Sequence, residues 1–182
     1  TYQAGVMFRR TLEANSCMIY QFLPSSSTAY THYRVNDGDS HTAVAYTAGV
    51  PSWVRITREG NTFTSFRSTD GVSWAIVAAP ILNITETAYV CLASSSRFLG
   101  QKGASVYNSV SVLPAPWNSY GLGNSLPGFS SFLYDQWSIT SGGKGITALT
   151  SDGGEFMCQT LRGDGSISAR VVSADLATAQ AG

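Results

Sequence analysis

Hydrophobic and polar residues alternate one by one over many short stretches of this chain, which are rich in Val, Tyr, Thr, Phe and Ile. Alternation with a period of two predicts β-strands, because successive side chains of a strand point to opposite faces of a sheet. Turn-forming Asn, Asp and Gly residues separate the stretches at intervals of ~8–12 residues, a spacing typical of antiparallel sandwiches. The predicted turns lie at residues 36–38, 59–61, 70–71, 99–100 and 163–165. The predicted strands span residues 5–10, 17–23, 29–35, 42–47, 53–57, 62–67, 73–77, 88–93, 105–113, 156–161 and 166–172.

The pattern contains no convincing amphipathic helix of several turns. Residues 9–15 and 174–181 are the best helical candidates, and both are short. We therefore expect an all-β fold with two antiparallel sheets that form a β-sandwich.

Two prolines within residues 114–117 mark the one linker-like stretch, because Pro holds the backbone extended and removes a hydrogen-bond donor. Residues 1–113, before the linker, hold most of the predicted strands and form the main part of the sandwich. Residues 118–182 begin with a glycine-rich, loop-like segment and end with two predicted strands. This second part would struggle to bury a core alone, so we expect it to complete the sandwich of 1–113 or that of the next copy.

The amino-acid composition favours an extracellular protein and argues against a protein that binds nucleic acid or membrane surfaces. Hydrophobic residues make up 43% of the 182 residues, which is enough for one buried core. Charged residues make up only 12%, and the formal net charge is zero, so Ser, Thr, Asn, Gln or attached sugar must hydrate the surface, as suits an extracellular or cell-surface protein. The two lysines, Lys102 and Lys144, form no basic patch, which argues against nucleic acid and membrane surfaces as partners. No apolar run approaches the ~18 residues of a membrane span.

Three cysteines, Cys17, Cys91 and Cys158, lie inside apolar, strand-like stretches. They form no C-x-x-C pair, and no His lies at metal-binding spacing from them. The pattern favours buried free thiols. One disulfide with one spare thiol is the alternative, because sequence alone does not report the geometry that a bridge requires.

The first five and the last five residues match at four positions, and both end in Gln-Ala-Gly. We interpret the match as one motif seen twice, in which a second copy begins at residue 178, although coincidence in an Ala-, Gly- and Thr-rich chain is the alternative. A repeat of this length corresponds to a whole domain. The chain would then be one link of a polymer of copies of itself. The residues assigned to self-assembly are Thr1, Tyr2, Gln3, Ala4, Gly5, Thr178, Ala179, Gln180, Ala181 and Gly182.

Four segments carry a resemblance to a known family: residues 4–9 (AGVMFR), 53–58 (WVRITR), 68–74 (STDGVSW) and 90–93 (VCLA). They resemble the concanavalin A-like β-sandwich modules of the "regulation of enolase protein 1" type, which occur in large secreted bacterial proteins. The similarity covers most of 1–113 and implies an antiparallel jelly roll of concanavalin A type. It supports the fold more than a function, because the group itself is poorly defined.

The two halves of the chain stand in permuted order relative to this family. The half that corresponds here to Trp137, Phe156 and residues 161–171 normally precedes the AGVM strand, whereas in this chain it comes last. Two arrangements that fit this order form a linear filament: a covalent tandem repeat cut in mid-domain, and separate subunits that exchange strands with their neighbours. A closed monomer whose halves pair within the chain is the third arrangement.

Catalytic groups are not indicated. A glycoside hydrolase of this fold type needs clustered carboxylates, whereas the glutamates here are isolated beside predicted turns, where solvated carboxylates are usual: Glu13, Glu59, Glu86 and Glu155. His32 and His41 could face each other across a hairpin, but no nucleophile motif or third ligand accompanies them. We expect no enzymatic activity and no cofactor.

Residues 36–40 place several oxygen-bearing side chains close together, a chemistry that suits calcium. Asp37 and Asp39 are the candidate ligands. The rest of an EF-type loop, including its distal glutamate, is missing. A hairpin turn is therefore the favoured interpretation, and calcium is the alternative.

The sequence contains candidate sites for covalent glycan attachment and aromatic residues that could bind sugar. Asn83 begins one N-glycosylation sequon, Asn83-Ile84-Thr85, in a polar turn. Of the tryptophans, Trp53 and Trp74 are expected in the core and Trp117 at the surface, where it could stack on a sugar ring. The candidate O-linked positions are Ser25, Ser26, Ser27 and Thr28.

These observations predict a non-enzymatic, extracellular structural repeat or subunit that assembles head to tail into a filament or giant surface fibre and carries covalently attached glycan. The alternative is a carbohydrate-binding adhesion module of a secreted protein, which would present an exposed concave face with Trp or Tyr beside Asn and Asp.

Overall fold

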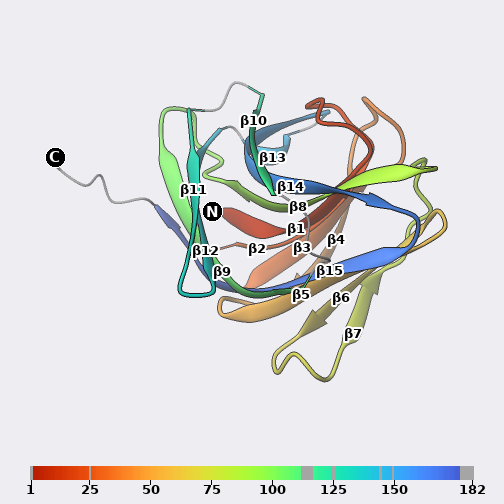
Figure 1. Cartoon of the computed structure of the whole chain (residues 1–182), viewed down its shortest axis with the longest axis horizontal. Coiled ribbons are helices and arrows are strands. Elements are labelled where there is room, and N and C mark those ends of the chain that lie inside the picture. The colour runs from red at the N-terminus through yellow and green to blue at the C-terminus, as the bar shows by residue number, and fades with distance from the viewer. Residues whose placement is uncertain are drawn as a thin grey trace, which may run out of the picture.

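Two antiparallel β-sheets pack face to face and form an all-β sandwich (Figure 1). The computed structural model describes residues 2–24, 26–111, 117–123, 126–143, 145–148 and 150–176. The regular elements in these residues are fifteen strands. The two sheets have eight and seven strands, and neither closes on itself, so the fold class predicted from the hydrophobic alternation is confirmed.

The eight-stranded sheet, called sheet A, has β1 near its centre. Its strands in spatial order are β10 (Asn118–Leu122), β14 (Ser151–Arg162), β8 (Thr87–Ser95), β1 (Gln3–Arg9), β2 (Met18–Pro24), β3 (Thr28–Arg34) and β4 (Thr42–Thr47), and β13 (Gly145–Ala148) pairs with β14 off this path.

The seven-stranded sheet, called sheet B, has β15 at its centre. Its strands in spatial order are β11 (Phe129–Leu133), β12 (Gln136–Gly142), β9 (Lys102–Ser111), β15 (Gly165–Leu176), β5 (Ser52–Glu59), β6 (Thr62–Ser68) and β7 (Ala75–Ala78). Its edge strands β11 and β7 therefore lie at opposite ends of one sheet.

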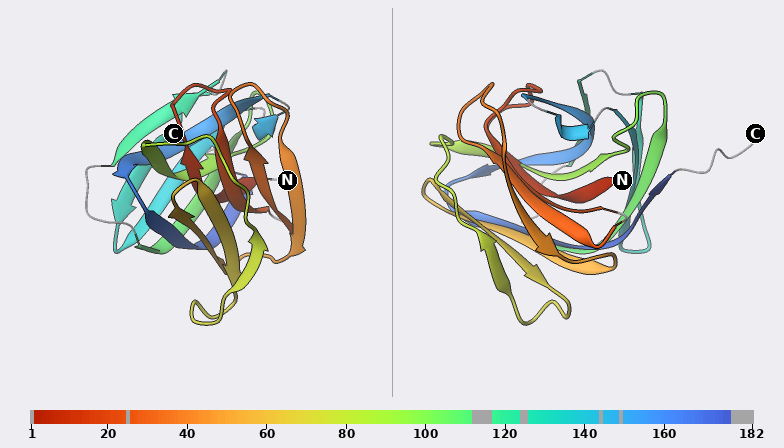
Figure 2. Two further views of the ribbon diagram at one scale, coloured as in Figure 1. Left: turned by 90° about the vertical axis from the view of Figure 1, so that its right-hand side faces the viewer. Right: turned by 180° about the vertical axis from the view of Figure 1, so that it is seen from behind.

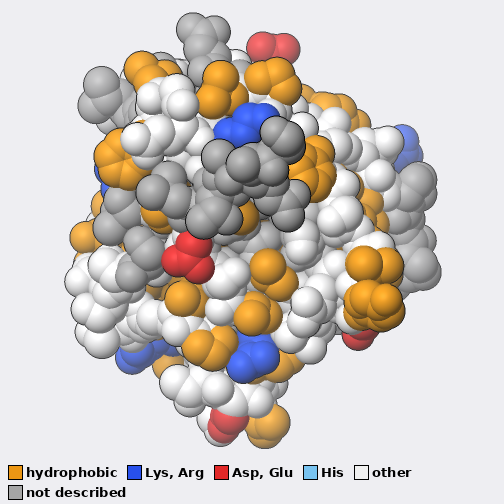
Figure 3. Space-filling view, turned by 90° about the vertical axis from the view of Figure 1, so that its left-hand side faces the viewer, with side chains coloured by type: hydrophobic (Ala, Val, Ile, Leu, Met, Phe, Trp, Pro, Cys, Tyr) orange, Lys and Arg blue, Asp and Glu red, His pale blue; other side chains and the backbone are white. Residues whose placement is uncertain are grey.

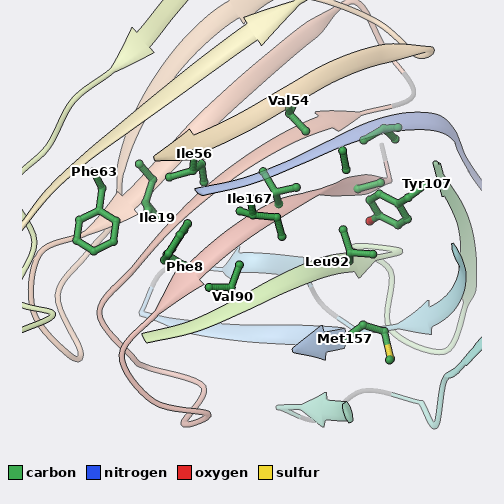
Figure 4. Close-up of a cluster of buried hydrophobic side chains, with 14 of the residues drawn as sticks. Phe8, Ile19, Val54, Ile56, Phe63, Val90, Leu92, Tyr107, Met157 and Ile167 are labelled. Carbon is green, nitrogen blue, oxygen red and sulfur yellow. The ribbon is translucent and has the colours of Figure 1, made fainter. Parts of the chain in front are cut away.

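The interior between the sheets is built from alternate residues of strands in both sheets. Phe8 and Ile19 of sheet A meet Val54, Ile56 and Ile167 of sheet B, and all five side chains are fully buried (Figure 4). Burying one side chain of this size stabilises the folded state by roughly 1.5–3 kcal/mol. The period-two pattern of the sequence thus marks the residues that hold the sheets together.

Hairpins close where the turn-forming residues predict them. Gly60 (φ 58°) lies between β5 and β6, and Gly163 (φ 73°) lies between β14 and β15. Glycine adopts this left-handed backbone without the steric cost that a Cβ atom adds. The Asp164 side chain accepts a hydrogen bond from the Gly60 amide (2.7 Å), which joins the two turns.

The segment predicted to be loop-like forms four strands, β10 to β13. β10 and β12 pair with strands remote in sequence, β14 and β9, whereas β11 and β13 pair with the strands that follow them, β12 and β14. The sequence prediction missed these strands because remote pairing leaves no local signal and the segment is rich in glycine.

The two helical candidates are wrong wherever the structure describes them. β1 runs to Arg9, and bends with one turn connect it to β2. β15 extends to Leu176, inside the second candidate, because its last residues pair with β9. Residues 177–181 lie outside the described residues.

The second part of the chain pairs with the first within one sandwich. β14 lies between β10 and β8, and β15 lies between β9 and β5. Among the three arrangements that fit the permuted order, this is the closed one. In the linker, residues 114–116 lie outside the described residues, and Trp117 packs against Trp137 with ring centroids 5.7 Å apart.

Cys91 of β8 and Cys158 of β14 form a disulfide. This corrects the expectation of free thiols for two of the three cysteines. The two residues are directly opposite in the register of the strands, and their Cα atoms are 4.1 Å apart. Cys17 stays a free, buried thiol, and burial raises its pKa to about 11. The pairing depends on strand register, which the spacing of cysteines in the sequence does not report.

Sheet A is buried on both faces at its central strands β1 and β2, whereas its edge strand β4 is largely exposed. Beyond the shared interior, its outer face carries a second apolar cluster, in which Met7, Tyr20 and Phe156 are 0% exposed. Leu12, from the β1–β2 connection, and Ile146 of β13 pack against or within this cluster. The outer face is therefore covered by these two segments.

A buried ion network fastens the covering segments to sheet A. Arg9 of β1 and Arg34 of β3 lie on either side of Asp152, with N–O distances of 3.3 and 3.2 Å, and all three side chains are 0% exposed. The Asp152 amide donates to the Ala14 carbonyl (2.7 Å), and the Arg9 guanidinium donates to the Thr11 carbonyl (2.7 Å). Burial lowers the pKa of Arg9, and the Asp152 carboxylate opposes that shift. One carboxylate thus compensates two buried cations.

Candidate assembly surface and ligand cavity

Edge strand β11 of sheet B presents large apolar side chains to solvent. Phe129 and Leu133 are 61% and 63% exposed, and Phe132, on the alternate face, is 55% exposed. β11 pairs with β12 on one side, and among the described strands it has no partner on the other. Natural sheets usually protect such an edge with charges, Pro or a bulge. β11 contains no charged residue and no Pro, so its edge is open to pairing.

A two-residue turn continues this apolar edge. Tyr134 and Asp135 have φ angles of 49° and 61°, the left-handed backbone of a tight hairpin turn. Tyr134 is 89% exposed at the tip. The hairpin therefore presents an apolar strand and an aromatic tip together.

An aromatic cluster supports the β11–β12 hairpin from behind. The ring centroids of Phe132 and Trp137 are 5.0 Å apart, and Trp117 packs on the same indole. Trp117 is partly buried and packs against the core, so its ring is only partly available at the surface. Figure 3 shows this side of the molecule, where hydrophobic side chains are dispersed among uncharged polar ones and charged side chains are few.

The opposite edge of sheet B is also apolar and uncharged. Ile76 of β7 is 67% exposed, and Val72 and Ile81 beside the strand are 82% and 68% exposed. Among the described strands, β7 pairs with β6 only. β11 and β7 lie on opposite sides of the molecule (Figure 1), and the hairpin of β6 and β7 stands out from the body (Figure 2).

The N-terminal residues assigned to self-assembly lie inside sheet A. Gln3, Ala4 and Gly5 belong to β1, which is paired with β2 on one side and with β8 on the other. Tyr2 is partly buried and packs against Phe98, with ring centroids 6.2 Å apart. The remaining residues of that assignment, Thr1, Thr178, Ala179, Gln180, Ala181 and Gly182, lie outside the described residues.

Gly5 lies where a side chain of sheet B enters the ladder of sheet A. The Gly5 amide donates to the Tyr107 hydroxyl (3.1 Å), which in turn donates to the Ala93 carbonyl (2.8 Å). Gly5 and Ala93 are opposite each other in β1 and β8, so the hydroxyl bridges the two strands. A Cβ atom at position 5 would collide with the Gln21 carbonyl oxygen, and the position therefore requires glycine.

Asn83 lies at the surface between two buried anchors. Leu82 and Ile84 are fully buried, whereas Asn83 is exposed. Arg58 holds the segment, since its guanidinium donates to the carbonyls of Ile84 (2.8 Å) and Glu86 (2.9 Å). The position suits a glycan acceptor, and glycosylation of Asn83 stays a prediction.

Ser26, Ser27 and Thr28 are exposed at the start of β3. Ser25 lies outside the described residues. O-linked modification at these positions stays a prediction.

Asp37 and Asp39 serve as acceptors in a turn. Asp37 accepts from the Cys17 amide (2.7 Å) and pairs with Arg10, while Asp39 accepts from the amide (3.0 Å) and side chain (2.8 Å) of Asn36. Burial acts to raise the pKa of Asp37, but the hydrogen bonds from Cys17 and Arg10 outweigh it and lower the pKa. Within the described ranges, no three His, Cys, Asp or Glu side chains gather as metal ligands. Calcium binding here stays a prediction.

His32 and His41 stack with ring centroids 4.5 Å apart, which confirms that they face each other. Phe22 and Tyr30 also contact His32, with centroids at 5.1 and 5.4 Å. Burial lowers the pKa of His32 to about 3, and His41 and Arg97 add to the shift. The imidazole is therefore neutral at neutral pH and packs as part of an aromatic group.

Glu155 corrects the expectation that the glutamates are surface groups. It is 5% exposed and accepts a hydrogen bond from the Ser119 hydroxyl across the pair of β14 and β10. Glu13, Glu59 and Glu86 are exposed. Glu155 looks like a turn residue in the sequence because two glycines precede it, but β14 continues through all three.

A cavity of about 490 Å³ opens where the end of β4 meets the hairpin of β6 and β7. Trp74 lines it and is partly buried, which corrects the expectation that Trp74 is a core residue on a strand. The residue lies in the connection before β7, after the turn at Gly71. Trp53 is also partly buried, and it lies against Gly71 rather than in the interior.

The sequence prediction missed the buried ion network and the apolar edge. Arg9 and Arg34 lie at the ends of predicted strands that are otherwise apolar or uncharged, and this position was the available signal, since an unpaired charge inside a buried strand is too costly to persist. The signal at Phe129 and Phe132 was their lack of period-two alternation. Neither signal identifies the residues that these side chains contact, because those residues are distant in sequence.

Comparisons with protein families, curated proteins and solved structures found no match. In the part of the chain that the structure describes, no helix has the length and apolar character needed to cross a lipid bilayer. The fold itself establishes the class of the protein as a two-sheet, antiparallel β-sandwich that carries a disulfide.

Proposed function

We propose that this chain is a non-enzymatic, extracellular structural module that assembles head to tail with copies of itself into a filament or surface fibre. The observation that carries the proposal is the pair of uncharged, apolar edges of sheet B, β11 and β7, on opposite sides of the molecule.

Pairing of β11 of one copy with β7 of the next would continue sheet B from molecule to molecule. Such strand addition supplies the open backbone groups with partners and covers Phe129, Leu133 and Ile76. The two edges are different surfaces, so the contact is head to tail, and it propagates unless its rotation closes a ring. In this mode of assembly, Gln3–Gly5 stay paired within sheet A of their own molecule and do not form the contact between copies.

Three further features favour an extracellular location. The Cys91–Cys158 disulfide is of a kind that persists in oxidising compartments. The chain carries few charges, and the exposed Asn83 sequon offers a site for a hydrating glycan. A filament with a nearly uncharged surface would gain solubility from such a coat.

Electron microscopy of the purified chain, combined with a denaturing gel, tests the proposal. We expect filaments, which dissolve to a band near 19.3 kDa if the copies are separate chains, or give a ladder of larger bands if they are covalently joined. Discrete monomers at every concentration would contradict assembly.

Edge variants test the contact itself. The double variant Phe129→Lys/Leu133→Lys adds charge to β11, and we expect it to abolish filaments while changing the free energy of unfolding by less than about 0.5 kcal/mol, as at other exposed positions. Thr57→Lys on the inner strand β5 is the matched control and should assemble normally. Normal filaments from the double variant would exclude β11 as the contact.

A further inference from the structure

The cavity beside β4 and the β6–β7 hairpin has the size of a small-ligand site. Its volume of about 490 Å³ lies within the ~300–1,000 Å³ typical of such sites. Its walls come from the end of β4, the start of β5 and both strands of the hairpin, so the β4–β5 and β6–β7 connections converge on one space.

Trp74 supplies the aromatic wall, and two contacts hold it in place. Its indole N–H donates to the Gly71 carbonyl (3.1 Å), and the Arg55 guanidinium lies 3.7 Å from the ring centroid over one face. Trp74 lines the cavity, whereas Arg55 does not. A fixed, apolar aromatic surface of this kind is suited to the C–H face of a sugar ring.

Arg67 supplies the charge of the cavity. Its guanidinium donates to the Thr47 carbonyl (2.7 Å) and lies 5.9 Å from the Tyr46 ring centroid, which sets its position. No carboxylate lines the cavity among the described residues. The nearest acidic residue in the hairpin turn, Asp70, is engaged by the amides of Val72 and Ser73 (2.8 Å each). The cavity is therefore cationic, and a guanidinium recognises carboxylates through charge-assisted hydrogen bonds.

Hydroxyl groups complete the lining. Thr47, Thr69 and Ser73 line the cavity, and so do Ser52 and Ser68, whose hydroxyls are bonded to the Ser68 carbonyl and to Asp70. Hydroxyls both donate and accept, so they match the hydroxyls of a saccharide in either sense. An indole, a guanidinium and a hydroxyl-rich wall together select a polyhydroxylated, ring-shaped and negatively charged ligand.

We propose that this cavity binds an acidic saccharide, whose ring packs on Trp74 and whose carboxylate pairs with Arg67. This binding function goes beyond the structural role proposed above and does not depend on it. With this site, an extracellular module would bind an acidic glycan beside the hairpin of β6 and β7.

Calorimetric titration of the whole chain with 3′-sialyllactose and with tri-galacturonate, and with lactose as the neutral probe, tests the proposal. We expect at least one acidic probe to bind at least 10-fold more tightly than lactose. Trp74→Ala and Arg67→Gln should each weaken that binding at least 10-fold, whereas Trp74→Phe, which keeps an aromatic ring, should retain most of it. Arg162→Gln and Tyr134→Ala remove an exposed cation and an exposed ring elsewhere and should leave it unchanged.

The thermal unfolding midpoint of each variant distinguishes loss of a contact from loss of the fold. If neither acidic probe binds with a millimolar or lower dissociation constant, or if lactose binds equally well, the proposal is overturned. Binding that survives Trp74→Ala or Arg67→Gln in folded protein would also overturn it, because that side chain would then not hold the ligand.

Discussion

The outer face of sheet A is largely covered by other segments of the chain, whereas the outer face of sheet B stays partly exposed to solvent. On sheet A, connecting segments cover the face, and the disulfide and the ion network lie beneath them, shielded from water. On sheet B, side chains such as Trp53, Arg55 and Thr64 stay partly exposed, and the cavity and the two apolar edges belong to this side. The comparison separates the part of the molecule that holds the buried ion network and the disulfide from the part that carries the proposed assembly edges and the proposed ligand cavity.

This division has a physical basis. Buried charges and disulfides are sensitive to any change around them, so they are placed where neighbouring segments hold them rigidly. Open edges and a hydroxyl-lined cavity need access to solvent and tolerate substitution. We therefore expect mutations on the two outer faces to differ in effect, and the following tests run from the largest expected change to the smallest.

Asp152→Asn should produce the largest loss. It leaves Arg9 and Arg34 buried without a counter-charge, and breaking a buried ion pair in this way costs about 3–5 kcal/mol. Denaturant unfolding measures the change, and Asp175→Asn, at an exposed position of β15, is the control, with an expected change below about 0.5 kcal/mol. Equal stability of the two variants would show that the network is not needed to hold the covered face.

Reduction of the Cys91–Cys158 disulfide should cost about 2–4 kcal/mol, because the bridge closes a long loop with a sequence separation of 67 residues. The unfolding midpoint with and without reductant reports the loss. A Cys17→Ala variant should keep the full response to reductant, whereas Cys91→Ser should abolish it. A response that disappears with Cys17→Ala would contradict the pairing.

Tyr107→Phe should cost about 1–3 kcal/mol, since it removes the hydroxyl that bridges Gly5 and Ala93 and leaves the buried Gly5 amide without this acceptor, while the Ala93 carbonyl keeps its hydrogen bond from the Tyr20 hydroxyl (3.1 Å). Tyr134→Phe makes the same chemical change at an exposed position and should be neutral. Denaturant unfolding compares the pair. If both variants are neutral, the bridge contributes nothing to the contact between the sheets.

Acid should weaken the fold through His32. Its pKa is about 3 in the folded chain against about 6.5 unfolded, so the unfolded state takes up the proton first. The stability from this group is complete above pH 6.5 and is lost as pH falls toward 3, by up to about 2 kcal/mol between pH 7 and pH 5. His32→Phe should flatten the stability profile in that window. An unchanged slope in the variant would assign the acid sensitivity to other groups.

Thr64→Ala on the outer face of sheet B should have the smallest effect. It removes one cross-strand contact with Thr57, which is worth about 0.2–1 kcal/mol. A loss as large as that of Asp152→Asn would contradict the division between a covered and an open face. Denaturant unfolding under the same conditions makes the comparison direct.

The sequence was sufficient for the strands of the first part and for their turns. Residues such as Phe8, Val54 and Ile56 were predicted from alternation alone, since a half-buried strand repeats every two residues. The positions of Gly60 and Gly163 were predicted from turn chemistry. The facing pair His32 and His41 followed from the hairpin between their strands.

The candidate site was less accessible to sequence reasoning. Trp53 and Trp74 were expected in the core but are partly exposed, because a tryptophan packs equally well in a core, on a face or at the mouth of a cavity. Phe129 and Phe132 fell in a segment predicted as loop, and their exposure depends on β11 being an edge strand. Edge position is a property of the whole sheet.

The sequence by itself determined the all-β class, the strand periodicity and the hairpin turns, because these follow from interactions between residues close along the chain. The tertiary structure alone decided which strands are edges, that Cys91 meets Cys158, that Asp152 lies between Arg9 and Arg34, and that Trp74 borders a cavity. The physical reason is that each of these depends on the register and order of strands far apart in sequence, which only the packing of both sheets around one core sets.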